Sequence, residues 1–212
     1  EAGLLLLNSN VREYFHSINE FNAEHKNTLA DLQVTPNKPA FDKPSTIIVV
    51  IGECASRNFM SAYTNIPNDT TPWLREKKNE PNFIVFENPY AVITNTVMAL
   101  ERGLTEKNQY NDKDFKKSAT IVDIAKGAGY FTSWYSNQGT TDNSDTPIAI
   151  IGKTADVSKW TNQDLNTLQY DGTLLEYLKE VDPNKNNFIV LHFMGSHDNY
   201  PNRYPPEFAK WG

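Results

Sequence analysis

Thr46-Ile-Ile-Val-Val-Ile-Gly52 is an unbroken run of apolar, mostly β-branched residues that ends in glycine. Such a run is typical of a strand buried on both faces of a parallel sheet. Further strands are predicted at Phe83–Phe86, Tyr130–Tyr135 and Phe188–Phe193, with a weaker one at Ile148–Ile151. The sequence therefore predicts one central sheet with its first strand near residue 46.

Helical patterns alternate with these strands. Residues 71–77 begin with Thr-Pro, a common helix start, and a second helix follows Thr94-Asn-Thr96. Residues 118–128 end at Gly129, and residues 171–181 place leucines on one face. Strands that alternate with helices indicate an α/β fold with a mostly parallel sheet.

The N-terminal part has a different pattern. Residues 8–33 have apolar residues near helical spacing, and residues 34–45 contain three prolines that break regular structure. We expect a boundary here, with a helix and proline-rich connector at 1–43 and the α/β domain at 44–212. The helix either lies on the core or connects to a membrane segment that is absent. We expect both chain ends to result from truncation.

Composition excludes several classes of protein. The 212 residues carry 20 Lys+Arg and 26 Asp+Glu, a net charge of −6, which does not favour binding to nucleic acid. No stretch approaches the roughly 20 apolar residues that a membrane-spanning helix needs. The single cysteine excludes an internal disulfide.

Polar side chains follow the predicted strands where ligands collect in α/β sheets. Glu53 follows the first strand, Thr94 and Thr96 precede a helix, Asn137 follows the third strand and His197 follows the last. Taken singly, each has an ordinary structural interpretation: a helix cap for the glutamate and threonines, a turn for the asparagine, and a pair with the neighbouring aspartate for the histidine. Their convergence at one sheet edge indicates a site.

Two nearby residues are interpreted as structural. His192 lies inside an apolar strand, so we expect a core histidine whose hydrogen bonds are satisfied. Cys54 is followed by Ala-Ser-Arg57, one residue short of the spacing of the sulfatase nucleophile motif, so we expect a small buried thiol rather than a nucleophile.

Five motifs in order resemble one known family. The chain resembles the periplasmic catalytic domain of bacterial phosphoethanolamine transferases, membrane-anchored members of the alkaline phosphatase/sulfatase superfamily, over about residues 44–206. The resemblance implies a truncated three-layer sandwich, in which residues 44–212 would be the N-terminal portion of the sulfatase-like catalytic domain. The motifs are Val49–Ser61, Asp69–Pro72, Thr94–Leu100, Trp134–Gln138 and His192–His197.

The resemblance also implies roles for individual residues. Glu53 would be a metal ligand, and Thr96 would be both a metal ligand and the threonine that accepts phosphoethanolamine. His197 would contact the transferred phosphate or a second zinc, and Asn137 would belong to the substrate pocket. The implied cofactor is Zn²⁺, which carboxylate, hydroxyl and imidazole ligands suit.

The implied activity is zinc-dependent transfer of phosphoethanolamine from phosphatidylethanolamine to lipid A or the lipopolysaccharide core. It would occur at the periplasmic face of the bacterial inner membrane, with the anchor outside this chain. The alternatives are a related phosphodiesterase or phosphoglycerol transferase, and a non-catalytic domain with an incomplete metal site. The family's Asp-His zinc ligands have no counterpart, because the chain contains no Asp-His dipeptide. We therefore expect weak zinc binding and little turnover from these 212 residues alone.

Overall fold

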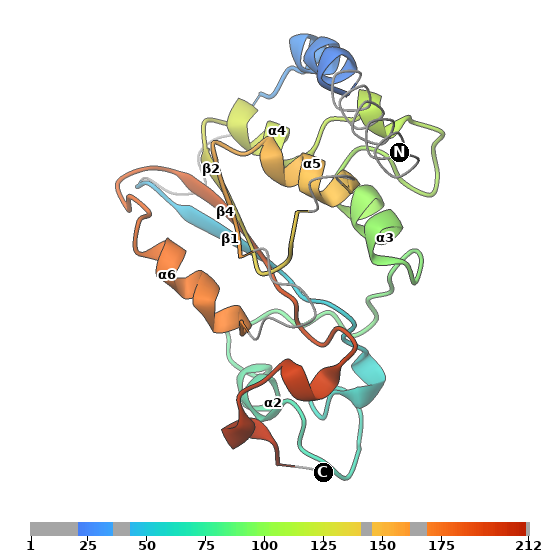
Figure 1. Cartoon of the computed structure of the whole chain (residues 1–212), viewed down its shortest axis with the longest axis vertical. Helices are drawn as coiled ribbons and strands as arrows, with labels where there is room; N and C mark the ends of the chain where they lie inside the picture. Colours follow the sequence, from blue (N-terminus) through green and yellow to red (C-terminus); the bar gives the residue numbers. More distant parts are fainter. Residues whose placement is uncertain (1–20, 36–42, 141–145, 162–168, 211–212) are drawn as a thin grey trace, which may run out of the picture.

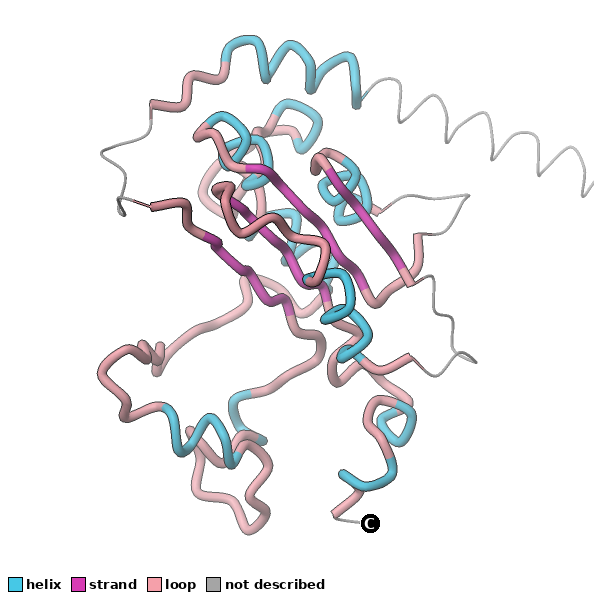
Figure 2. Tube along the Cα trace, turned by 90° about the vertical axis from the view of Figure 1, so that its left-hand side faces the viewer, coloured by secondary structure: helices cyan, strands magenta, loops and turns pink. Residues whose placement is uncertain are grey.

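A four-stranded, entirely parallel sheet organises the molecule (Figures 1 and 2). The computed structural model describes residues 21–35, 43–140, 146–161 and 169–210. Its strand order is β1-β4-β2-β3. The strands are β1 (Thr46–Ile51), β2 (Phe131–Ser136), β3 (Val157–Trp160) and β4 (Asn187–His192). The expectation of an α/β fold with a parallel sheet is confirmed.

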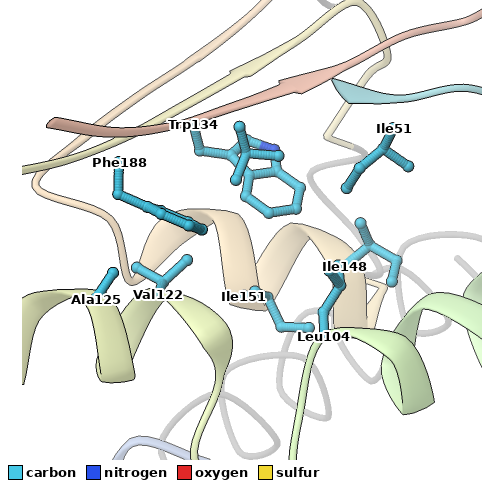
Figure 3. Packing of buried hydrophobic residues seen from close by; sticks show 9 residues of the cluster. Ile51, Leu104, Val122, Ala125, Trp134, Ile148, Ile151 and Phe188 are labelled. Carbon is cyan, nitrogen blue, oxygen red and sulfur yellow. The ribbon is translucent and has the colours of Figure 1, made fainter. Parts of the chain in front are cut away.

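Helices cover both faces of the sheet and make three layers (Figure 1). One face packs against α3 (Thr96–Gly103), α4 (Ile121–Gly127) and α5 (Pro147–Lys153), around Trp134 (Figure 3). The other face packs against α6 (Leu175–Leu178). The helix α2 (Pro72–Lys77) lies beyond the carboxyl ends of the strands (Figure 1).

The register of the strands brings their carboxyl ends into line. His192 at the end of β4 pairs with Ile51 at the end of β1 and with Ser136 at the end of β2. Ser136 in turn pairs with Trp160, the last residue of β3. The loops that follow the four strands therefore begin at one edge of the sheet.

The run Ile148–Ile151 is helical, so the prediction of a weak strand there was wrong. The residues belong to α5, in which Thr146 accepts a hydrogen bond from the Ala149 amide and Pro147 occupies the first turn. The run appears continuously apolar because most of this helix is buried, and a short apolar run has no period that separates a buried helix from a strand.

Two further strand predictions need correction. Phe83–Phe86 has no regular structure, and Ile84 and Phe86 are largely exposed. β3 was missed, because Val157–Trp160 is four half-buried residues with no strong apolar run. β1 exists as predicted, but it lies at the edge of the sheet, and Ile48 and Val50 are about half exposed rather than buried on both faces.

The described part of the predicted N-terminal helix lies on the domain. Residues 21–31 are helical, and residues 8–20 of the prediction lie outside the described residues. Phe21 and His25 are buried. His25 Nε2 lies 3.0 Å from Asp123 Oδ2 of α4. The division at residue 43 remains a prediction, since residues 36–42 also lie outside the described residues.

Candidate active site

A cavity of about 210 Å³ lies at the carboxyl edge of the sheet. Its lining combines residues from the ends of β2, β3 and β4, the loops after β1 and β4, and the starts of α3 and α5. Apolar lining comes from Trp134, Trp160 and Ile148 among others. The polar lining residues include Glu53, Thr96, Ser136, Gln138, His192 and His197.

Glu53 and Thr96 are in direct contact within this cavity. The Thr96 hydroxyl donates a hydrogen bond of 2.7 Å to Glu53 Oε1. Thr96 is the first residue of α3, and the preceding Asn95 caps the helix by accepting from the Met98 amide at 3.1 Å. Glu53 is buried, two residues after the end of β1. The sequence prediction that these two groups share one site is consistent with this geometry.

The Gly-Ser-His loop packs directly on the backbone of Glu53. Gly195 has φ +54°, a left-handed conformation that favours glycine. A Cβ at this position would lie 2.7 Å from the Glu53 backbone nitrogen. The Ser196 amide donates to the Glu53 carbonyl at 3.0 Å. Glu53 is therefore held between its own strand and the loop that follows β4.

Asp171 fixes that loop from the other side. Its carboxylate accepts hydrogen bonds from the amides of Met194 (2.8 Å) and Gly195 (3.0 Å). It also accepts from the side-chain amide of Asn137 at 2.8 Å. In the sequence, Asp171 is only the first residue of a predicted helix, because its sequence neighbours do not reveal the distant amides that it binds.

Asn137 lies behind the cavity. Its side chain is fully buried, donates to the Gln169 carbonyl at 2.9 Å as well as to Asp171, and accepts from the Thr161 hydroxyl at 3.0 Å. The next residue, Gln138, is the one that lines the cavity. The structure therefore places Asn137 where it joins loops that shape the pocket.

His197 lines the cavity while its ring remains about half exposed. Its Nδ1 atom contacts the carboxylate of Asp198. The two interpretations drawn from the sequence are thus compatible, since the ring is paired with the aspartate and also faces the site.

His192 occupies the centre of the sheet edge and also lines the cavity. Its Nδ1 lies 3.0 Å from Ser136 Oγ, and burial lowers the pKa of the imidazole to about 4. Its Nε2 is buried and has no hydrogen-bond partner within the described part of the chain. The expectation of a fully satisfied core histidine was therefore wrong.

Cys54 is exposed, so the prediction of a buried thiol was also wrong. It adopts φ 50°, and its backbone amide and thiol both approach Glu53 Oε1, at 3.2 and 3.4 Å. Partial desolvation, followed by the neighbouring Glu53 carboxylate, raises the pKa of the thiol. Cys54 therefore does not have the lowered pKa of an activated nucleophile.

The donor set fits part of a zinc site. Glu53 Oε1 and Thr96 Oγ1 are adjacent oxygen donors that face the same cavity, as two ligands of one ion would be. Among the described residues, no group of three or more His, Cys, Asp or Glu side chains could hold a metal ion. The described residues thus offer two adjacent oxygen donors, whereas zinc prefers about four ligands.

Comparison with known proteins identifies the family. The sulfatase family profile matches residues 45–212, and the chain belongs to this family. The chain is 32% identical to the phosphoethanolamine transferase EptC of Escherichia coli K12 over 175 residues, and 33% identical to the phosphoethanolamine transferase CptA of Salmonella typhimurium LT2 over the same length. In both cases the match covers 80% of this chain and 30% of the relative.

Solved structures agree with this assignment. The C-terminal periplasmic domain of EptC from Escherichia coli, in a complex with zinc, matches with a TM-score of 0.75 and 31% identity, over 82% of this chain and 50% of that domain. The soluble domain of lipooligosaccharide phosphoethanolamine transferase A from Neisseria meningitidis shares the fold, with a TM-score of 0.67 and 20% identity, over 87% of this chain and 55% of that one. The resemblance found from the motifs is confirmed.

Proposed function

We propose that this chain carries the nucleophile half of a zinc-dependent phosphoethanolamine transferase. The observation that carries the proposal is the 2.7 Å contact between the Thr96 hydroxyl and the buried Glu53 carboxylate, inside a cavity at the sheet edge. The names of the relatives support the type of reaction. Because the chain spans about a third of their length, the activity is that of the whole protein.

The chain's own groups prepare Thr96 for attack. The carboxylate of Glu53 accepts the hydrogen of the Thr96 hydroxyl and orients it. Thr96 begins an eight-residue helix, whose free amides favour an approaching phosphate. A zinc ion held by Glu53, Thr96 and further ligands would lower the pKa of the hydroxyl and neutralise phosphoryl oxygens.

The transfer requires two displacements. Thr96 Oγ1 attacks the phosphorus of phosphatidylethanolamine, the bond from phosphorus to the diacylglycerol oxygen breaks, and diacylglycerol leaves with the proton. An acceptor oxygen of lipid A or the lipopolysaccharide core then attacks the same phosphorus. The bond from phosphorus to Thr96 Oγ1 breaks, and Thr96 Oγ1 regains a proton as the acceptor oxygen loses its own. His197 contacts the phosphoryl group in this scheme, and Asn137 supports the pocket wall.

The location follows from the same proposal. The zinc-bound structural relative is a periplasmic domain, which supports a site on the periplasmic face of the inner membrane. No helix within the described residues is long and apolar enough to cross a membrane. We assign the membrane association, as part of this proposal, to a segment outside this chain.

The test is labelling of Thr96 in the whole protein that carries this chain. Zinc-loaded protein is incubated with a fluorescent phosphatidylethanolamine, and peptides are analysed by mass spectrometry. We expect a phosphoethanolamine adduct on Thr96, its absence in Thr96→Val, and partial activity in Thr96→Ser, which keeps the hydroxyl. Loss of the nucleophile should lower turnover at least about a thousandfold.

Three results would contradict the proposal in different ways. Unchanged transfer in Thr96→Val would remove the nucleophile role. Release of free phosphoethanolamine without transfer to lipid A or core acceptors would indicate a phosphodiesterase of the same family. Absence of zinc from the whole protein would indicate a non-catalytic domain.

A further inference from the structure

His192 occupies the position at which the four strand ends meet. It is the last residue of β4, between the ends of β1 and β2, and only 5% of its surface is exposed. It lines the same cavity as Thr96 and Glu53. A group so placed can touch whatever occupies the cavity.

The hydrogen bonds around Ser136 favour one of the two neutral tautomers of the His192 ring. Ser136 Oγ accepts the backbone N–H of Gln138 at 3.2 Å and lies 3.0 Å from His192 Nδ1. A hydroxyl has one hydrogen and two lone pairs, so either tautomer could bond to it, but within the described residues only an unprotonated Nδ1 gives that hydrogen an acceptor. When the hydroxyl donates to Nδ1, the neutral imidazole carries its own hydrogen on Nε2.

The Nε2–H group is then a buried donor without an acceptor from the described chain. Leaving such a group unpaired costs about 1–3 kcal/mol. A second donor has the same status, because the indole N–H of Trp134 is buried and has no hydrogen-bond partner among the residues described. The Trp134 and His192 rings lie 5.9 Å apart, and both residues line the cavity. The Trp134 indole nitrogen lies against Gly152, where a Cβ would come within 2.9 Å of it. The His192 Nε2–H donor is therefore the one that favours an occupant of the cavity with acceptor oxygens.

We propose that His192 donates a hydrogen bond, through Nε2–H, to a non-bridging oxygen of the phosphoryl group that reacts at Thr96. The identity of the phosphoryl group rests on the proposed function, whereas the contacts of Ser136 favour the tautomer that provides the donor. Ser136 is a positioning residue, which sets the tautomer and the angle of the ring. A preorganised donor of this kind contributes most when charge builds on the phosphoryl oxygens.

The tautomer and the ligand can be tested on this chain without any activity. Long-range ¹H–¹⁵N spectra of the histidine rings, assigned with His192→Gln, report which nitrogen is protonated. We expect a protonated Nε2 and an unprotonated Nδ1, and titration with inorganic phosphate should shift the Nε2–H signal. An unprotonated Nε2, or a signal that phosphate leaves in place, would overturn the proposal.

Activity of the whole protein provides the second test. His192→Gln keeps an N–H near the position of Nε2, whereas His192→Phe keeps the ring shape without a donor. We expect turnover within about tenfold of wild type for the first variant and about 10²–10³-fold lower for the second, with an unchanged zinc content. Wild-type turnover in His192→Phe would overturn the proposal, as would lost zinc, which would make His192 a metal ligand.

The outcomes separate this inference from the proposed function. A wild-type protein that transfers no phosphoethanolamine refutes the function, and the phosphate titration still decides the role of His192. If His192→Phe does not fold, as judged by its melting temperature, His192→Gln decides. Turnover within about tenfold supports the donor, and a loss above about a hundredfold overturns it.

Discussion

Substitution of Gly195 tests the packing that holds Glu53. In Gly195→Ala, the new Cβ would lie 2.7 Å from the Glu53 nitrogen and 3.1 Å from its carbonyl oxygen. Both are backbone atoms, so no change of rotamer relieves the overlap. The left-handed φ of +54° costs an alanine about 1–2 kcal/mol, and overpacking typically adds about 1–3 kcal/mol. We expect the free energy of unfolding to fall by about 2–5 kcal/mol.

Urea unfolding followed by tryptophan fluorescence measures this change, because Trp134 is fully buried. Gly103→Ala is the matched control, since a Cβ at Gly103 meets nothing within 4 Å. The Gly103→Ala control should change the free energy of unfolding by less than about 1 kcal/mol. Because Gly103 is the last residue of α3, any change should slightly favour alanine. Equal stability of the two variants would refute the close packing of the loop on Glu53.

Two other predictions concern the carboxylates of Asp171 and Asp123, each of which binds a segment distant in the sequence. Asp171→Asn replaces one acceptor oxygen by an amino group, which then faces an amide donor such as that of Met194. The free energy of unfolding in urea should therefore fall by about 1–3 kcal/mol. A fall below about 0.5 kcal/mol would mean that the loop does not depend on this carboxylate. Burial would raise the pKa of Asp123, but hydrogen bonds from His25 and Thr120 outweigh it and hold the pKa below its usual value. Because the folded pKa is depressed, this stabilisation is present above about pH 4 and is lost as the pH falls through the folded value. Between about pH 5 and pH 2, Asp123→Asn should therefore lose less free energy of unfolding than the wild type. If the free energies of unfolding of the two proteins fall in parallel over this range, Asp123 is not stabilised by its contacts with His25 and Thr120.

Strong local patterns made the fold predictable. The β-branched run of β1 and the apolar run of β4 specified strands, and helices between them required parallel pairing. Ile148–Ile151 was misread because burial makes helix and strand equally apolar over four residues. Phe83–Phe86 has the residues of a strand and yet lies exposed in a loop. The sequence pattern shows which residues are apolar, but it does not show which helix or strand packs against them.

The site was predictable only where residues follow strands directly. Glu53 follows β1 directly, whereas Thr96 begins α3 and follows no strand, so its role was predicted from the resemblance of the motifs. Asp171 was missed because its partners are 23 and more residues away in the chain. His192 was taken as core because its neighbours are apolar, and only the three-dimensional contacts show that one ring nitrogen is paired and the other is not.

The position of β1 at the margin of the sheet has a dynamic consequence. Within the described residues, β1 pairs with β4 alone, whereas β4 is flanked on both sides. A marginal strand opens more readily than a central one, so its amides should exchange with solvent first. The carboxylate with which Thr96 must cooperate thus follows a strand that is paired on one side only, and any ion that grips Glu53 would also tighten β1.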